Sequence, residues 1–153
     1  YYDPYRDDGY DKALGVRRVE KLDDLLAQSW VLSLHCPLTD ENRGIINAAA
    51  VVKMPRGFFL VNTARGEIID ETALIKMLEA GELAGAGLDV FEHEPAVSPR
   101  MLKLAKQHKI VVLPHMGSAT VEGRVEMGEK VIQNIKTFID GHRPRDRVIA
   151  SMV

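Results

Sequence analysis

The run "FFLVN" (58–62) is apolar on four consecutive positions and lies between two helical patterns, "NAAAVVKM" (47–54) and "DETALIKMLEAG" (70–81). Consecutive apolar residues in a short run are typical of a strand that is buried on both faces of a parallel sheet. Asn47 and Asp70 are suitable N-caps for the two flanking helices. A helix, a strand and a second helix in this order indicate an α/β protein.

The same alternation of strands and helices extends along most of the chain. Further strands are predicted at "WVLSL" (30–34), "GAGLDVF" (85–91) and "IVVL" (110–113), and further helices at "LDDLLAQ" (22–28), "SPRMLKLAKQ" (98–107) and about 120–140. Ser98 is expected to cap its helix, with Pro99 at the first helical position. Apolar residues spaced by three, four and seven positions give the last helix one wide apolar stripe. The pattern predicts a doubly wound parallel sheet of the α/β class.

Composition and charge narrow the class of protein. A chain of 153 residues with 46% hydrophobic residues can bury one core. Twenty basic against 22 acidic residues leave a formal charge of −2, which does not favour nucleic acid or an anionic membrane as partner. The single cysteine, Cys36, excludes an intrachain disulfide and fits a reducing compartment, and the apolar runs are too short to span a bilayer. We therefore expect a cytoplasmic protein without a nucleic-acid or membrane partner.

Polar residues that could bind a ligand or take part in catalysis follow three of the predicted strands. Arg65 follows the second, Glu92 and Glu94 follow the third, and His115 follows the fourth. Because ligands of open parallel sheets bind outside the carboxyl ends of the strands, these side chains can converge on one edge. An arginine can bind a carboxylate, and a histidine can exchange a proton near neutral pH. A glutamate bonded to the histidine would orient it, but the spacing does not choose between Glu92 and Glu94. No metal site is predicted.

Three longer motifs carry a family resemblance: "LVNTARGEIIDETAL" (60–74), "AGAGLDVFEHEP" (84–95) and "VLPHMGSAT" (112–120). Together they resemble the D-isomer-specific 2-hydroxyacid dehydrogenase family, and most closely its glyoxylate and hydroxypyruvate reductase branch. The resemblance implies a Rossmann-like NAD-binding domain. It also implies an oxidoreductase that transfers a hydride between NAD(H) and a small 2-hydroxy or 2-oxo acid.

The resemblance assigns roles to the residues at the strand ends. The arginine of the first motif is Arg65, which would bind the carboxylate and carbonyl oxygen of the substrate. The glutamate before proline in the second motif is Glu94, which would orient and charge the histidine. The histidine of the third motif is His115, which would pass the proton. Glu92 becomes a bystander in this assignment.

The resemblance also implies a set of cofactor-binding residues. Asp89 and the backbone near Thr63, Ala64 and Gly117 would line the nicotinamide pocket, whereas the loop "HCPLT" (35–39) would line the adenosine. For His35 a packing or loop-fixing role is favoured over catalysis, and for Cys36 the role of a small wall residue is favoured over that of a nucleophile. Asp3, in "YYDP", resembles the acidic residue that binds the ribose hydroxyls and favours NAD over NADP. The full set is Asp3, His35, Cys36, Pro37, Thr39, Thr63, Ala64, Arg65, Asp89, His115, Gly117 and Ser118.

The glycine-rich fingerprint expected about 20 residues before Asp3 is absent from the sequence. We therefore expect residues 1–141 to be a partial NAD-binding domain without its first strand and Gly-rich loop, and residues 142–153 to be a tail leading toward a substrate domain. Such a fragment is expected to be inactive alone. The family resemblance also suggests a homodimer. The alternative function is that of the corepressor branch, an NAD(H)-sensing binding protein of the same fold, which "YYDPY", "SLHCPLT" and "NTARG" also resemble.

Overall fold

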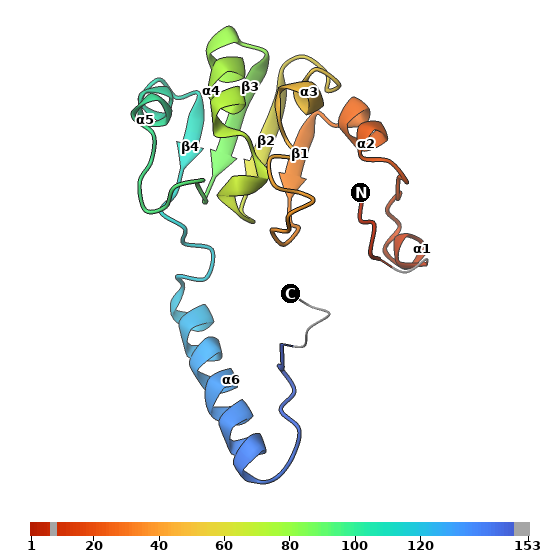
Figure 1. Ribbon diagram of the computed structural model, residues 1–153, viewed down its shortest axis with the longest axis vertical. Helices are drawn as coiled ribbons and strands as arrows, with labels where there is room; N and C mark the ends of the chain where they lie inside the picture. Colours follow the sequence, from red (N-terminus) through yellow and green to blue (C-terminus); the bar gives the residue numbers. More distant parts are fainter. Residues whose placement is uncertain (7–8, 149–153) are drawn as a thin grey trace. The chain divides into compact units, whose positions relative to one another are not determined.

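A computed structural model describes residues 1–6 and 9–148 of the chain (Figure 1). The chain divides into two compact units, Tyr1–His115 and Met116–Val153. The first unit contains the sheet and the helices around it, and the second contains one long helix and the segment that follows it.

The first unit is built on a four-stranded parallel sheet with the order β1-β2-β3-β4, which Figure 1 shows. The strands are β1 (Val31–Leu34), β2 (Phe58–Asn62), β3 (Leu83–Leu88) and β4 (Ile110–Val112). The helices are α1 (Tyr10–Leu14), α2 (Leu22–Gln28), α3 (Ala48–Val51), α4 (Glu71–Ala80) and α5 (Pro99–Lys106), with a 3₁₀ turn, η1 (Gly66–Ile68), after β2. The predicted third strand, 85–91, is corrected: β3 begins earlier and ends at Leu88, so Asp89 follows the strand.

Only one face of this sheet is buried within the described residues. Because the strands follow one another in sequence order and parallel crossovers are right-handed, α3, α4 and α5 cover the same face. The residues that point to this face, Leu32, Leu60, Ala86 and Ile110, are buried. Their neighbours Val31, Phe59 and Val111 are exposed. The expectation of strands buried on both faces is therefore wrong for these residues, since helices of this unit cover one side only.

The helix ends largely follow the sequence. Asn47 Oδ1 accepts a hydrogen bond from the Ala50 N–H (3.1 Å), and Asp70 Oδ1 accepts one from the Ala73 N–H (3.0 Å). The capping bond expected of Ser98 is not formed, although Ser98 occupies the N-cap position of α5. Pro99, the next residue, has no N–H to satisfy, which reduces the need for a capping side chain.

The second unit is organised by α6 (Val121–Ile139), which lies within the predicted range of about 120–140 and has Thr120 as its N-cap. Thr120 Oγ1 accepts a hydrogen bond from the Gly123 N–H at 3.0 Å. The predicted apolar stripe is present, but it is exposed: none of the residues of α6 is buried. Asn134 Nδ2 donates to Asp146 Oδ2 at 2.8 Å, so the segment after α6 returns to that helix. The end of the predicted tail, 149–153, lies outside the described residues.

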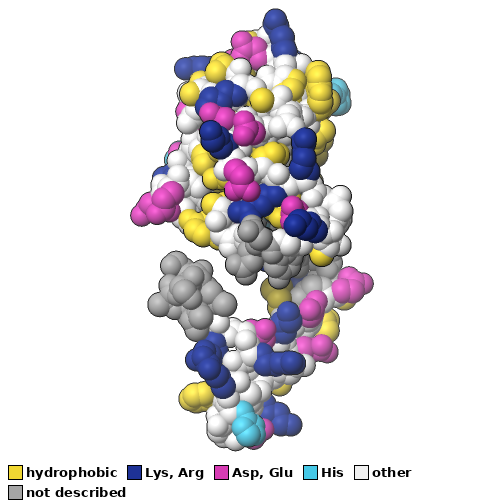
Figure 2. All heavy atoms as spheres, turned by 90° about the vertical axis from the view of Figure 1, so that its right-hand side faces the viewer, with side chains coloured by type: hydrophobic (Ala, Val, Ile, Leu, Met, Phe, Trp, Pro, Cys, Tyr) yellow, Lys and Arg dark blue, Asp and Glu magenta, His cyan; other side chains and the backbone are white. Residues whose placement is uncertain are grey.

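Two surface properties bear on possible partners. Basic and acidic side chains are interspersed over the face drawn in Figure 2, in keeping with a formal charge of −2 for the chain. Among residues 1–6 and 9–148, no helix has the length and apolar character needed to cross a membrane.

Candidate active site

The carboxyl ends of the parallel strands bring the predicted residues to one edge of the sheet. His35 and Cys36 follow β1, Thr63 to Arg65 follow β2, Asp89 follows β3, and His115 comes shortly after β4. The turn that leads to His115 stays paired beyond β4, since the Leu113 N–H donates to the Leu88 carbonyl oxygen at 2.9 Å. The arrangement places the third and fourth strand ends next to each other.

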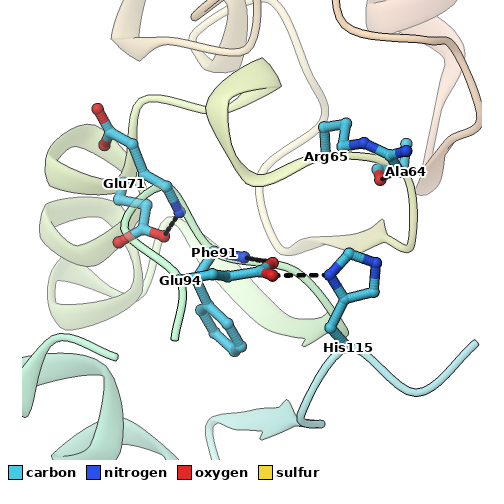
Figure 3. A network of polar contacts seen from close by, with 7 residues as sticks. Ala64, Arg65, Glu71, Phe91, Glu94 and His115 are labelled. Atoms are coloured by element: carbon cyan, nitrogen blue, oxygen red, sulfur yellow. Dashed lines mark hydrogen bonds and ion pairs between the residues drawn. The ribbon is translucent and has the colours of Figure 1, made fainter. Parts of the chain in front are cut away.

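At this edge Glu94 and His115 form a direct pair (Figure 3). Oε2 of Glu94 lies 2.7 Å from Nδ1 of His115, across a separation of 21 residues. Its other oxygen, Oε1, accepts a hydrogen bond from the Phe91 N–H at 3.0 Å. An ionised carboxylate can only accept hydrogen bonds, so Nδ1 carries the proton of this bond and Nε2 is left as the nitrogen for exchange with a ligand. Glu94, and not Glu92, is the acid that contacts the histidine side chain.

The backbone of His115 is in the left-handed region, with φ of 51°. This conformation costs a non-glycine residue about 1 kcal/mol and is maintained only where surrounding contacts over-determine it. The bond to Glu94 and the pairing of Leu113 with Leu88 supply such contacts on either side of the turn. Strain of this kind is common at functional sites.

The electrostatics of the site favour the ionised form of the Glu94 carboxylate. The hydrogen bond from His115 lowers the pKa of Glu94 below its ordinary value, partial burial opposes this effect, and the Phe91 N–H adds to the lowering. The positive charge of Arg65 makes a smaller contribution in the same direction. The three side chains therefore belong to one electrostatic cluster.

The lowered pKa of Glu94 predicts how the pair affects stability as a function of pH. A carboxyl with a lower pKa in the folded than in the unfolded state stabilises the fold above its unfolded pKa, and this contribution is lost as pH falls through the folded pKa. Glu94→Gln is therefore expected to lower the midpoint of thermal unfolding at pH 6, with a difference that shrinks below about pH 4. A pH-independent difference in calorimetric scans of the two proteins would contradict this assignment.

Asn62 shapes the turn that carries Arg65, a role that the sequence motifs did not predict. Its side chain is fully buried, with 0% exposed. Oδ1 accepts from the Ala64 N–H at 3.0 Å, and Nδ2 donates to the Arg65 carbonyl oxygen at 2.8 Å. Its own carbonyl oxygen accepts from the Asp89 N–H at 3.0 Å. The available signal was an amide at the last position of an otherwise apolar strand, where a buried polar group needs partners.

Removing the Asn62 amide is expected to destabilise the protein and to disturb the position of Arg65, whereas removing a capping amide from another part of the fold should affect stability only. Asn62→Ala leaves the Ala64 N–H and Arg65 carbonyl without that partner, which should cost about 1–3 kcal/mol in urea unfolding. It should also displace Arg65, so that binding of a small carboxylate to the full-length protein weakens about tenfold. The matched control is Asn47→Ala, which removes the cap of α3 at a cost of about 1 kcal/mol and should leave that affinity unchanged. Equal affinities in both variants would contradict the role of Asn62.

Arg65 itself is exposed and has donors available for a ligand. Nη1 donates to the Ala64 carbonyl oxygen at 2.6 Å. A guanidinium carries five N–H donors in a planar fork, so this one bond leaves a paired edge that suits a carboxylate. Gly66, the next residue, packs against the loop that bears Glu94: a Cβ added there would lie 2.0 Å from the Phe91 carbonyl carbon. The Arg65 turn and the Glu94 loop are thus in backbone contact.

The predicted adenosine loop is held by local bonds. Ser33 Oγ lies 2.8 Å from Nε2 of His35, so this histidine side chain is hydrogen-bonded to a residue of β1. Although Cys36 is exposed as a residue, partial burial of its thiol raises the pKa of Cys36, which disfavours a reactive thiolate. The charge of Asp3 adds to this rise, so Asp3 and the loop lie near each other. Asn42 closes the loop by donating to the Pro37 carbonyl oxygen at 2.6 Å and accepting from the Thr39 N–H at 2.9 Å.

The remaining predicted residues divide between the two units. Asp89 is buried, at 4% exposed, directly after β3. Thr63 is exposed and Ala64 is buried in the Asn62 turn. Gly117 and Ser118 belong to the second unit. In the part of the chain that the structure describes, no group of three or more His, Cys, Asp or Glu side chains is placed to hold a metal ion.

Comparisons with known proteins identify what the chain is similar to. The family model of the D-isomer specific 2-hydroxyacid dehydrogenase, NAD binding domain, matches residues 1–117. The glyoxylate reductase of Korarchaeum cryptofilum is 42% identical over 153 residues, which are 100% of this chain and 45% of that protein. The holo form of Rhodotorula graminis D-mandelate dehydrogenase superposes with a TM-score of 0.86 at 35% identity, over 98% of this chain and 44% of that one.

A further solved structure was determined with cofactor. The NAD-complexed D-isomer specific 2-hydroxyacid dehydrogenase of Lactobacillus delbrueckii ssp. bulgaricus superposes with a TM-score of 0.84 at 29% identity, over 97% of this chain and 47% of that one. The chain spans a little under half the length of these three proteins. The matches confirm the predicted resemblance, the Rossmann-like α/β class and NAD as the cofactor of the family. The proteins named here are reductases and dehydrogenases, so the corepressor alternative gains no support from them.

Proposed function

Because the chain belongs to the family of D-isomer specific 2-hydroxyacid dehydrogenase NAD-binding domains, we propose that the whole protein is an NAD-dependent oxidoreductase acting on a small 2-hydroxy or 2-oxo acid. The substrate class that the motifs favour is that of glyoxylate and hydroxypyruvate. The observation that carries the proposal is the Glu94–His115 pair, with Oε2 and Nδ1 2.7 Å apart, at the sheet edge that also carries Arg65.

The proposed mechanism assigns one task to each side chain of this cluster. Arg65 binds the substrate carboxylate through paired charge-assisted hydrogen bonds and polarises the adjacent carbonyl oxygen. His115 gives the proton on Nε2 to that oxygen during reduction and takes it back during oxidation. Glu94 holds the imidazole by Nδ1 and so fixes the orientation of the ring. Bound NAD(H) supplies or accepts the hydride.

The residues present fit the nicotinamide and adenosine parts of such a cofactor. Asp89, a buried carboxylate directly after a strand, and the backbone of the Asn62 turn would hold the nicotinamide side. The loop 35–39 would border the adenosine, and Asp3, whose charge acts on Cys36, would bind the ribose. For Gly117 and Ser118 the assignment rests on the motif alone. Residues 1–141 would then be part of the NAD-binding domain, with 142–153 leading toward a substrate domain.

Two further properties belong to the same proposal. A homodimer would cover exposed apolar side chains such as Phe59 on the sheet and Ile132 on α6. A cytoplasmic location suits a chain whose single cysteine, Cys36, is a free thiol. Sedimentation velocity of the full-length protein tests the dimer.

The activity is tested by titrating the full-length protein with NADH, followed by fluorescence, and then adding glyoxylate or hydroxypyruvate. We expect saturable NADH binding and oxidation of NADH with at least one of the two acids, whereas the 153-residue chain alone is expected to be inactive. NADH binding without turnover on any small 2-oxo acid would favour the NAD(H)-sensing alternative. Absence of NADH binding in the full-length protein would contradict both functions.

A further inference from the structure

Glu71 makes a contact that the proposed mechanism does not use. It is the first residue of α4, and its Oε1 accepts a hydrogen bond from the Glu92 N–H at 2.7 Å. The two residues are 21 positions apart, so this bond connects the start of α4 to the loop after β3 (Figure 3). The same loop carries Glu94, whose Oε1 accepts from the Phe91 N–H.

The peptide between Phe91 and Glu92 is held from two directions. Its N–H is bound by the Glu71 carboxylate. Its carbonyl group packs on Gly66, where an added Cβ would be 2.0 Å from the carbon and 2.2 Å from the oxygen. The preceding N–H, that of Phe91, binds Oε1 of Glu94, so this peptide directly adjoins the donor that holds the Glu94 carboxylate. Glu71 is thus connected to His115 by the loop 91–94 and three hydrogen bonds, which join Glu71 to Glu92, Phe91 to Glu94, and Glu94 to His115.

We propose that Glu71 is a positioning residue for the Glu94–His115 pair, because its bond to the Glu92 N–H orients the peptide next to the Phe91 donor that holds Glu94. The inference rests on the proposed dehydrogenase function. A different role for Glu71 is to stabilise the N-terminus of α4 by its charge alone. The two roles make opposite demands on charge and side-chain length.

Two substitutions in the full-length protein separate these roles. Glu71→Gln removes the charge but keeps an acceptor oxygen at the same reach, whereas Glu71→Asp keeps the charge near the helix start and is one methylene shorter. For a positioning role we expect Glu71→Gln to retain kcat within about twofold and Glu71→Asp to lower kcat about tenfold, since small displacements of a catalytic group cost that much or more. The KM for NADH should change in neither. Glu79→Ala is the control on the same helix, since it removes the pair with Arg100 near the other end of α4.

A second readout does not depend on turnover. In protein labelled with ¹³C at glutamate carboxyl carbons, Glu94 should titrate below its ordinary range in the parent, Glu71→Gln and Glu79→Ala, and closer to that range in Glu71→Asp. The proposal is overturned if Glu71→Asp leaves both kcat and the Glu94 titration unchanged, or if Glu71→Gln harms both as much as Glu71→Asp. A parent protein that shows no NADH oxidation would refute the proposed function instead, and the Glu94 titration would still decide the role of Glu71.

Discussion

Replacing His115 with alanine is expected to lower kcat/KM of the full-length protein for its 2-oxo acid by about 10³-fold, within the range typical of a lost general acid. The imidazole is held through Nδ1 by Glu94 at 2.7 Å, which leaves Nε2 to donate the proton that the reduced oxygen needs. No other described side chain forms this pair with Glu94, so water would have to replace the histidine. Steady-state NADH oxidation measures the loss, and NADH affinity measured by fluorescence should stay within a fewfold of the parent.

His108→Ala is the matched control for this experiment. Among residues 1–6 and 9–148, His108 is the other non-glycine residue with a positive φ, at 59°, and it is an exposed residue in the turn before β4. Its removal tests the general effect of losing a histidine from a left-handed turn, and we expect kcat/KM to change by less than about twofold. If both histidine variants lost activity equally, the role of His115 in proton transfer would be wrong.

Gly66→Ala is expected to destabilise the fold by about 3 kcal/mol or more and to abolish most of the activity. An added Cβ would lie 2.0 Å from the Phe91 carbon, 2.2 Å from the Phe91 oxygen and 2.4 Å from the Glu92 nitrogen. All three are backbone atoms, so no side-chain rotation relieves the contact. The turn that carries Arg65 and the loop that carries Glu94 must therefore separate. Urea unfolding of the variant measures the loss of stability.

Gly87→Ala provides the comparison within the same sheet. Gly87 lies in β3, and a Cβ there would meet only Val61 Cγ2, at 4.0 Å. Added carbon at an unstrained strand position reduces the entropy of the unfolded chain, so we expect a change of no more than about 1 kcal/mol in either direction. A Gly66→Ala protein as stable as Gly87→Ala would show that the two loops are not packed backbone to backbone in solution.

Local rules of the chain determined much of the fold. Consecutive apolar residues identified all four strands that the described residues form, and the caps Asn47 and Asp70 are present as predicted. These features depend on residues within a few positions of one another, where spacing and side-chain chemistry decide the structure. The parallel order then implies that polar residues after successive strands reach one edge. The positions of Arg65 and His115 at that edge follow from this order.

Other features depended on contacts between distant segments. The spacing left Glu92 and Glu94 equal until the family resemblance favoured Glu94, and only the fold puts Glu94 within 2.7 Å of His115. The two acids are two positions apart in sequence, but the path of the loop sends the Glu94 side chain to the histidine and the Glu92 N–H to Glu71. Spacing within the motif cannot decide this, because the outcome depends on how the loop meets another strand end.

The sequence by itself determined the strands and the caps Asn47 and Asp70, because each depends on neighbouring residues, and the parallel order of the strands then determined the edge at which the polar side chains gather. The tertiary structure alone decided that one sheet face is exposed within the described residues, that Asn62 organises the Arg65 turn and that Gly66 and Glu71 contact the Phe91–Glu92 peptide. Each of these depends on which backbone atoms meet when separate strand ends pack together. That packing is set by strand register and close backbone approach, which no local pattern in the chain encodes.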